Sequence, residues 1–145
     1  YARLSHRSIA RAMSLGAGET TVLRMAAGYA SFVNGGREVA PTLIDTVQDH
    51  RGRLIWRSDV RRCAGCDAAS PAAGPPELVG ERRLVTDPIA AYQMVNLLTG
   101  VVQRGTGTRA GEGLGRPIAG KTGTTDDYKD AWFVGFTPDI VVAVW

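Results

Sequence analysis

The residues best suited to chemistry lie together in one short stretch, Ala-Gly-Lys-Thr-Gly-Thr-Thr at positions 119–125. Lys121 brings a positive charge, and Thr122 and Thr124 bring hydroxyl groups that can donate hydrogen bonds. The glycines at positions 120 and 123 leave one face of an extended backbone bare, so that a ligand or another backbone can approach closely. This combination suits a carboxylate ligand and the oxyanion of an acyl-transfer intermediate.

The residues around this stretch predict that it is a strand. β-branched side chains are frequent up to Thr125, a turn signal follows at Asp126 and Asp127, and apolar runs occupy most of the remaining chain. We therefore expect three antiparallel strands joined by short polar turns, at residues 117–125, 131–137 and 139–145.

Gly115 to Thr122 also fits the spacing G-x-x-x-x-G-K-[ST] of a phosphate-binding loop. Such a loop follows a buried strand and opens a helix, whose N–H groups hold the phosphates. Residues 105–115 are instead glycine-rich and polar, and the residues that follow Lys121 favour a strand over a helix. We therefore expect no nucleotide site. A solvated lysine on an exposed strand is the other simple interpretation of Lys121.

Two amphipathic helices are predicted to pack beside these strands. The first spans residues 19–33, is capped by Thr20 or Thr21 and ends at Asn34-Gly35-Gly36. The second begins at Asp87-Pro88 and ends at Gly105. Its buried face is expected at Ile89, Tyr92, Val95, Leu98 and Val102. Helices beside an antiparallel sheet make an α+β fold.

Between the helices, the chain is predicted to form a hairpin and then a long surface loop. Residues 42–47 and 54–56 flank a glycine-bearing turn, which is typical of a hairpin. Residues 58–83 are rich in Ala, Pro, Gly, Ser and Arg, which bury little apolar surface. The two histidines, His6 and His50, are expected to be solvated side chains.

The two cysteines, Cys63 and Cys66, lie inside this loop with the spacing C-x-x-C. A zinc site would need four ligands, and the two histidines are too distant and too badly spaced to complete one, so no metal is expected. A redox pair would normally open a helix after a strand, which the prolines of the loop oppose. In an oxidising compartment we expect a disulfide that stiffens the loop locally.

Composition bounds the size and the partners of the chain. A chain of 145 residues with 44% hydrophobic residues supports one core, so we expect one domain or most of one. The net charge of +3 comes from scattered arginines, which does not favour nucleic acid. No apolar stretch approaches the roughly 20 residues of a membrane span. Because there is no initial methionine and no turn after the last strand, we expect a piece of a longer protein.

Several stretches together resemble a known family. The Lys-Thr-Gly triad at positions 121–123 stands, in the family's order, among four further stretches with the family's pattern. These are residues 13–21 (MSLGAGETT), 29–36 (YASFVNGG), 102–108 (VQRGTGT) and 130–138 (DAWFVGFTP). The chain resembles the transpeptidase domain of class A penicillin-binding proteins, which are bifunctional and of high molecular weight. The resemblance implies the α+β fold of penicillin-binding proteins and serine β-lactamases, in incomplete form.

The resemblance also implies a function, a D,D-transpeptidase that cross-links peptidoglycan through a serine acyl-enzyme and that β-lactams acylate. Lys121 would be catalytic, and so would Thr124, whose backbone N–H would donate to the oxyanion. Substrate-binding residues would be Thr122, Gly123, Thr124 and Thr125. No cofactor is implied.

The implied partners are stem peptides ending in D-Ala-D-Ala, β-lactam antibiotics and a glycosyltransferase domain upstream in the parent chain. The implied location is the periplasmic face of the bacterial inner membrane, where the parent protein would be anchored.

The family's nucleophile lies in a Ser-x-x-Lys element, which precedes the Lys-Thr-Gly triad together with a Ser-x-Asn element. No serine of this chain has lysine three places on or asparagine two places on. We therefore expect residues 1–145 to be the C-terminal portion of one transpeptidase domain, inactive alone. A serine β-lactamase or D,D-carboxypeptidase of the same fold, and a non-catalytic penicillin-sensing module, remain alternatives. Water access for deacylation separates the hydrolases from a transpeptidase, and we expect it to be set outside this chain.

Overall fold

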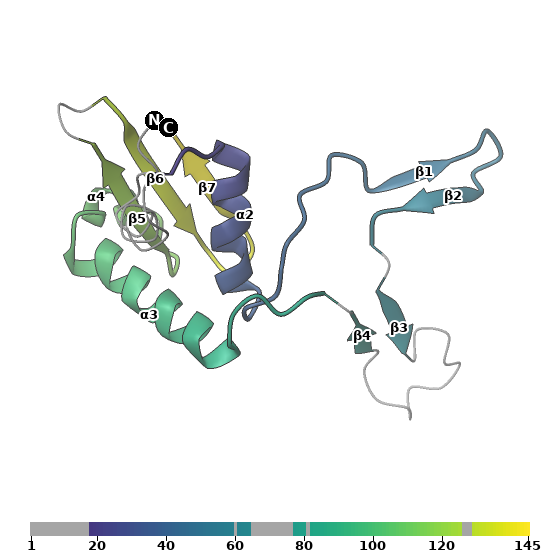
Figure 1. Ribbon diagram of the computed structural model, residues 1–145, viewed down its shortest axis with the longest axis horizontal. Coiled ribbons are helices and arrows are strands. Elements are labelled where there is room, and N and C mark those ends of the chain that lie inside the picture. The colour runs from purple at the N-terminus through teal and green to yellow at the C-terminus, as the bar shows by residue number, and fades with distance from the viewer. Residues whose placement is uncertain (1–17, 60, 65–76, 81, 126–128) are drawn as a thin grey trace, which may run out of the picture.

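A computed structural model describes residues 18–59, 61–64, 77–80, 82–125 and 129–145. These residues form two parts, a body of helices packed on a sheet and an arm that extends from it (Figure 1). The body carries the Lys-Thr-Gly triad. The arm is built from residues that lie in the sequence between the two long helices.

The sheet of the body has three antiparallel strands that are consecutive in the chain. Strand β5 spans Ala119–Thr124, β6 spans Ala131–Phe136 and β7 spans Val141–Val144, in the order β5-β6-β7. The three strands predicted from the sequence are confirmed, each of them shorter than predicted. Among the strands that the structure describes, β6 is central, and β5 and β7 form the two edges of the sheet.

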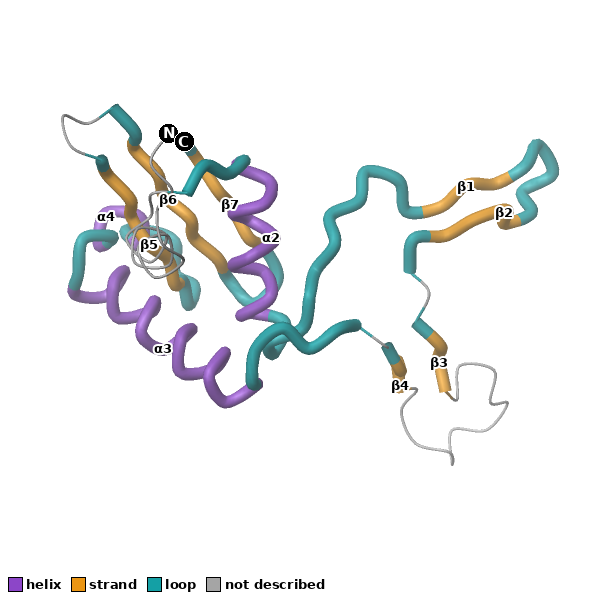
Figure 2. The backbone as a smooth tube through the Cα atoms, in the orientation of Figure 1, coloured by secondary structure: helices purple, strands orange, loops and turns teal. Residues whose placement is uncertain are grey.

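Helices α2 (Val22–Val33) and α3 (Pro88–Arg104) pack against the same face of this sheet (Figure 2). Thr21 caps α2, because its hydroxyl accepts a 3.2 Å hydrogen bond from the backbone N–H three residues on. Asp87 caps α3 in the same way, at 2.8 Å and 3.1 Å to two N–H groups. Both predicted caps are confirmed, and α2 begins at Val22 rather than at the predicted residue 19. A one-turn helix α4 (Thr108–Gly111) follows α3, where the sequence predicts only a glycine-rich connection.

The core lies between the helices and the sheet. Leu98 of α3, Ala119 of β5 and Phe136 of β6 are at most 6% exposed. Partly buried side chains from both helices and from β7 pack around them, namely Tyr29, Val33, Val95 and Val141. Burial raises the pKa of the Tyr29 hydroxyl. The hydrophobic effect therefore fixes the start of β5, two residues before Lys121.

Two positions predicted for the buried face of α3 are wrong. Ile89 and Tyr92 are 68% and 71% exposed, whereas Leu98 and Val102 are buried as predicted. The first turns of α3 border an open cavity of about 330 Å³ beside α2, and only the later turns reach the packed sheet. Helical periodicity marks an apolar face without showing how far the sheet extends beneath it.

The opposite face of the sheet stays open in the part of the chain that the structure describes. Side chains alternate along a strand, so Phe133, Val142 and Val144 project away from the helices. Val142 and Val144 are 50% and 54% exposed. Within the described ranges, the body therefore has two layers, and no described helix or strand covers the second face of the sheet.

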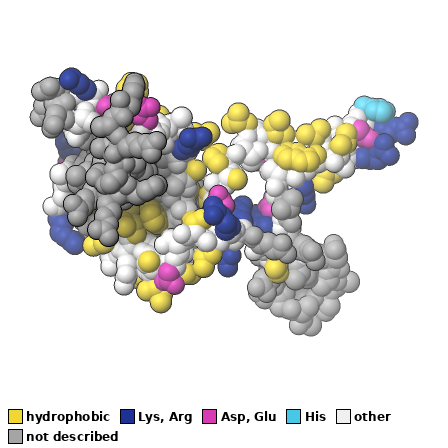
Figure 3. Space-filling view, in the orientation of Figure 1, with side chains coloured by type: hydrophobic (Ala, Val, Ile, Leu, Met, Phe, Trp, Pro, Cys, Tyr) yellow, Lys and Arg dark blue, Asp and Glu magenta, His cyan; other side chains and the backbone are white. Residues whose placement is uncertain are grey.

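The arm begins with the hairpin that the sequence predicts. Strand β1 (Thr46–Gln48) pairs with β2 (Leu54–Arg57). Apolar side chains are exposed along this hairpin and in the segment before it (Figure 3). They are Leu43, Ile44, Val47, Leu54, Ile55 and Trp56.

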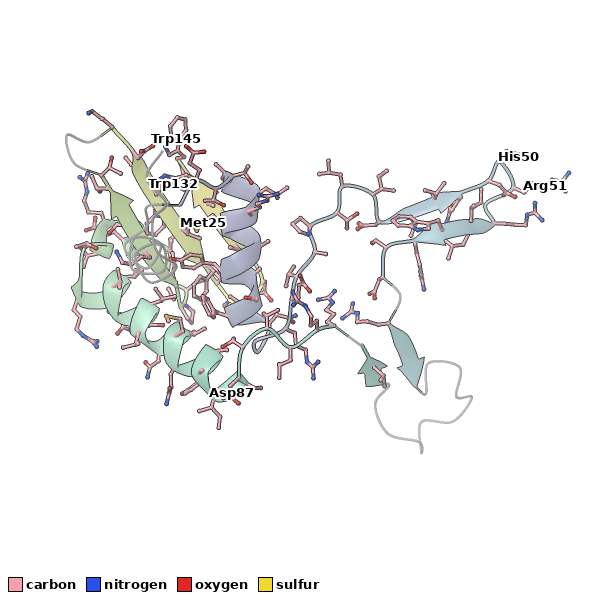
Figure 4. The ribbon with its side chains drawn as sticks, viewed as in Figure 1. Met25, His50, Arg51, Asp87, Trp132 and Trp145 are labelled. Carbon is pink, nitrogen blue, oxygen red and sulfur yellow. The ribbon has the colours of Figure 1, made fainter. Side chains whose placement is uncertain are left out.

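His50 and Arg51 lie at the tip of the hairpin, away from the body (Figure 4). His50 is exposed, in agreement with the predicted solvated side chain. His6 lies outside the described residues. Among the described helices, none is long and apolar enough to cross a membrane.

A second pair of short strands continues the arm. Strand β3 (Arg62–Ala64) pairs with β4 (Glu77–Val79) within the region 58–83, for which the sequence predicts a loop. Strands of three residues are too short for their side-chain alternation to show in the sequence. Cys63 lies in β3 opposite Leu78. Cys66 lies outside the described residues, so the predicted disulfide stays a prediction.

Two adjacent segments, residues 36–38 and 83–86, join the arm to the body, and we call them the neck. The backbone N–H of Glu38 donates to the carbonyl of Arg83 at 2.9 Å. The Glu38 carboxylate also accepts two hydrogen bonds from the Arg83 guanidinium, at 3.0 Å and 3.2 Å. That guanidinium holds the pKa of the Glu38 carboxyl below its usual value.

Gly36 closes the neck on the side of the body. Its carbonyl accepts hydrogen bonds from the N–H groups of Val85 and Thr86, at 2.8 Å and 3.2 Å. Its φ is +83°, and a Cβ there would lie 2.3 Å from the Thr86 carbonyl oxygen. Only glycine fits this position without displacing the backbone. One residue further on, Arg37 forms an antiparallel bridge with Leu84.

Candidate active site on strand β5

The Lys-Thr-Gly triad occupies the middle of β5 at one edge of the sheet. Lys121 lies opposite Val134 of β6, and Thr122 lies opposite Phe133. On its other side, β5 pairs with no further strand of the described residues. Backbone groups on that side can therefore meet an extended ligand, which is how a peptide adds to the edge of a sheet.

The two glycines of β5 differ in what surrounds them. A Cβ at Gly120 would lie 2.8 Å from the carbonyl oxygen of Val134 and 2.9 Å from the Phe133 ring. Backbone atoms of β6 thus approach Gly120 closely, as expected, but together with the Phe133 ring they leave no space for a ligand there. A Cβ at Gly123 would approach only the Cβ of Trp132, at 3.3 Å. Gly123 is the more open of the two positions.

The side chain of Lys121 is exposed and donates a 2.6 Å hydrogen bond from Nζ to the carbonyl oxygen of Thr122. None of the ion pairs found between described residues involves Lys121. A carbonyl group leaves the positive charge uncompensated, and the lysine stem is flexible enough to turn its ammonium toward an anion. Lys121 is therefore able to attract an anionic ligand to the edge of the sheet.

Thr122 is half-buried, and its Oγ1 lies 2.7 Å from Oγ1 of Thr106. Thr106 belongs to the connection between α3 and α4. No role is predicted for Thr106 from the sequence, although it lies in the stretch 102–108 that contributes to the family resemblance. A contact between residues so far apart in the chain leaves no local pattern by which sequence could reveal it.

The end of β5 is tied to the start of β6. The N–H of Thr125 donates to the carbonyl of Asp130 at 3.1 Å, and the Thr125 hydroxyl accepts from the Asp130 N–H at 2.9 Å. The Asp130 carboxylate accepts a 2.7 Å hydrogen bond from the indole of Trp145. Trp132 and Trp145 lie together above this end of the sheet (Figure 4), with ring centroids 6.5 Å apart. These contacts hold the backbone next to Thr124, which is itself exposed.

The cavity beside α2 and α3 lies at the other end of β5. From this part of the chain it is lined by Pro117, Ile118 and Ala119, and its other walls include apolar side chains of both helices. Lys121 does not line it. The described ranges contain no group of three or more His, Cys, Asp and Glu side chains that could hold a metal ion.

Residues 4–145 match the family model described as the penicillin binding protein transpeptidase domain. This chain belongs to that family. The resemblance stated from the triad and its neighbouring stretches is therefore confirmed.

The chain is similar to penicillin-binding proteins named 1A. It is 43% identical over 136 residues to penicillin-binding protein 1A of Rickettsia conorii, covering 90% of this chain and 17% of the relative. It is 46% identical over 134 residues to penicillin-binding protein 1A of Neisseria flavescens, covering 92% of this chain and 15% of the relative. The chain thus spans less than a fifth of the length of these curated relatives.

Solved structures agree on the fold. The crystal structure of penicillin-binding protein 1A from Haemophilus influenzae matches with a TM-score of 0.69 and 28% identity, over 91% of this chain and 22% of that chain. The D,D-transpeptidase domain of a peptidoglycan glycosyltransferase from Eggerthella lenta matches with a TM-score of 0.61 and 30% identity, over 86% of this chain and 26% of that chain. The predicted α+β fold of penicillin-binding transpeptidase domains, in incomplete form, is confirmed.

Proposed function

We propose that residues 1–145 are the C-terminal portion of one transpeptidase domain in a class A penicillin-binding protein. The reaction is acyl transfer between peptidoglycan stem peptides. A serine from a Ser-x-x-Lys element upstream of this chain attacks the penultimate carbonyl of D-Ala-D-Ala, and the terminal D-Ala leaves. The amine of a second stem peptide then displaces the serine. Family membership and the similarity to a D,D-transpeptidase domain support this proposal.

The observation that carries the proposal is the set of donors on one accessible strand. Lys121 is exposed without an ion-pair partner among the described residues, and Thr122 and Thr124 lie on the same strand. The leaving D-Ala and a penicillin both carry a carboxylate. A carboxylate that accepts charge-assisted hydrogen bonds from an ammonium and two hydroxyls is held more strongly than by neutral contacts.

The Thr124 backbone, Gly123, and Thr125 just after the strand complete the assignment. The backbone N–H of Thr124 donates to the oxyanion of the tetrahedral intermediate, and Lys121 also orients the substrate and polarises the Ser-x-Asn element. Gly123 lets the substrate backbone come close to β5. Thr125 accepts one hydrogen bond from Asp130, and its hydroxyl hydrogen remains available to the carboxylate.

The proposed partners follow from this reaction. They are stem peptides ending in D-Ala-D-Ala, β-lactams that acylate the same serine, and a glycosyltransferase domain upstream in the parent chain. The proposed location is the periplasmic face of the inner membrane, with the parent protein anchored there. No step of the proposed reaction uses a cofactor or a metal.

The proposal is tested by Lys121→Ala in the full-length protein. We expect the rate of acylation by a fluorescent penicillin to fall by about 100-fold or more, because a preorganised charge at such a site contributes several kcal/mol. Lys129→Ala is the matched control, since Lys129 is the other lysine of the chain and is also exposed. Its acylation rate should equal that of the parent. Equal rates in Lys121→Ala and the parent would contradict the proposal.

A second assay separates the transpeptidase from its alternatives. Purified full-length protein should join two stem peptides through a new amide bond. Rapid release of hydrolysed penicillin would indicate a serine β-lactamase, and release of D-Ala without cross-linking would indicate a D,D-carboxypeptidase. Stable acylation with neither reaction would indicate a penicillin-sensing module.

A further inference from the structure

Thr106 contacts the triad but has no role in the reaction proposed above. Its hydroxyl oxygen lies 2.7 Å from that of Thr122, the central residue of the triad. Thr106 is exposed and Thr122 is half-buried. The contact therefore joins the exposed segment that follows α3 to the strand that carries Lys121.

The backbone around Thr106 is tightly folded. The N–H groups of Gly105 and Gly107 both donate to the carbonyl of Val101, at 3.1 Å and 3.0 Å. A Cβ at Gly105 would lie 2.9 Å from that carbonyl oxygen, so a larger residue does not fit there without a shift. Because both neighbours are held against the last turn of α3, the position of Thr106 relative to β5 is determined by the helix.

The chemistry of two hydroxyls at this distance limits how they can be used. Each hydroxyl has one hydrogen and two lone pairs. One hydrogen lies between the two oxygens, so one hydrogen of the pair is left for a third group. A carboxylate only accepts hydrogen bonds, so a carboxylate bound at Thr122 selects the arrangement in which Thr106 donates to Thr122. A hydroxyl that accepts a hydrogen bond also donates more strongly.

We propose that Thr106 is a positioning residue for carboxylate recognition, donating to Thr122 so that the Thr122 hydrogen points at the carboxylate of the stem peptide or β-lactam. This inference rests on the proposed function of the triad. Thr106 takes no part in the acyl transfer itself. It holds in place one donor that the triad offers to the ligand.

The test compares benzylpenicillin with its methyl ester in the full-length protein, because the ester lacks the carboxylate. Thr106→Val keeps the shape of the side chain and removes the hydroxyl. We expect it to slow acylation by benzylpenicillin about fivefold, the effect of roughly one hydrogen bond, and to leave acylation by the ester unchanged. Thr106→Ser restores a hydroxyl and should return the benzylpenicillin rate to within about twofold of the parent.

Coupling to Thr122 gives a second measurement. If Thr106 acts through Thr122, the double variant Thr106→Val/Thr122→Val should acylate no more slowly than Thr122→Val alone. An equal loss with benzylpenicillin and its ester would overturn the inference, since it would show that Thr106 only fastens the α3–α4 connection to β5. If the fold reduction in acylation rate of the double variant equals the product of the two single reductions, the inference is overturned as well.

Lys121→Ala, measured alongside, separates failure of this inference from failure of the proposed function. A large loss in Lys121→Ala with a parent rate in Thr106→Val would overturn the role of Thr106 alone. Parent rates in Lys121→Ala would overturn both. The midpoint of thermal unfolding of each variant should stay close to that of the parent. If Thr106→Val is unfolded while Thr106→Ser remains folded, the contact is purely structural and the inference is overturned.

Discussion

Trp145 donates a 2.7 Å hydrogen bond from its indole nitrogen to the carboxylate of Asp130, joining the end of β7 to the start of β6. Asp130 in turn exchanges two hydrogen bonds with Thr125 at the end of β5. All three strands of the sheet are thus linked at the end where Thr124 is exposed. The conformation of β5 beside Thr124 depends on residues from the far edge of the sheet.

Trp145→Phe tests this link, because it removes the indole donor and keeps an aromatic ring beside Trp132. We expect a loss of about 0.5–1 kcal/mol, as for one exposed hydrogen bond. In the full-length protein this should lower the temperature at which penicillin labelling is lost by about 2–4 °C. Asp130→Asn is the control, since its amide oxygen still accepts, and it should lose less. Equal thermal midpoints in Trp145→Phe and the parent would contradict the link.

The Glu38–Arg83 pair predicts that the neck weakens in acid. Arg83 lowers the pKa of Glu38 in the folded protein, so the pair stabilises the neck above the ordinary pKa of glutamate, about 4.3, and this stabilisation is lost as the pH falls through the lowered value. Amide hydrogen exchange at residues 36–38, corrected for intrinsic rates, should become faster below about pH 4. The effect should be modest because the pair is exposed.

Glu38→Gln removes the titrating group in the neck and should flatten this pH dependence. Asp49→Asn is the matched control, since Asp49 also has a lowered pKa, caused by Arg53, but lies near the tip of the hairpin. In Asp49→Asn, amide exchange in the neck should depend on pH as it does in the parent. If the corrected amide exchange rates of the neck do not depend on pH in the parent, the Glu38–Arg83 pair contributes nothing to the stability of the neck.

Replacing both Cys63 and Cys66 with serine should leave penicillin acylation within about twofold of the parent, because a disulfide that closes so short a loop constrains little of the chain. Cys63 lies in the arm, far from β5 (Figure 1). Non-reducing mass spectrometry should show the parent two hydrogens lighter than its reduced form. Zinc at one equivalent per chain would instead indicate a metal site.

The 145-residue chain purified alone should not be labelled covalently by a fluorescent penicillin. Acylation needs a serine activated by a nearby base, and no serine of this sequence fits the Ser-x-x-Lys or Ser-x-Asn pattern. Intact mass spectrometry provides the measurement, and adding the separately expressed upstream segment is the positive arm. A penicillin adduct mapped to a serine of this chain would place the nucleophile here instead.

The elements of the body were predictable because their signals are local. Asp87-Pro88 gives a capped start, and the apolar runs after Asp127 give consecutive strands, so α3 and the sheet follow from neighbouring residues. The close approach of another backbone at Gly120 was predicted, but the loss of ligand space there was not predictable, because the ring that takes part of this space comes from Phe133 on the next strand. The predicted burial of Ile89 and Tyr92 was wrong for a similar reason, since an apolar stripe does not show where its helix extends past the sheet.

The candidate site divides in the same way. Lys121, Thr122 and Thr124 could be named from one heptapeptide, because a triad on a strand is a local pattern. Thr106 could not be assigned a role, since its partner lies on a different element and only the packing of α3 on β5 brings the two together. The resemblance covered the stretch around Thr106 without explaining it.

The neck has a consequence for how this chain can vary. Arg37 and Leu84 are bridged, so the polypeptide leaves and re-enters the body at a single place. Topologically, everything between these residues is an insertion with adjoining ends, and its length does not alter the distance that the ends must span. Evolution or engineering can therefore extend, trim or exchange this appendage while α2, α3 and β5 keep their places, and the two parts of the molecule can diversify at different rates.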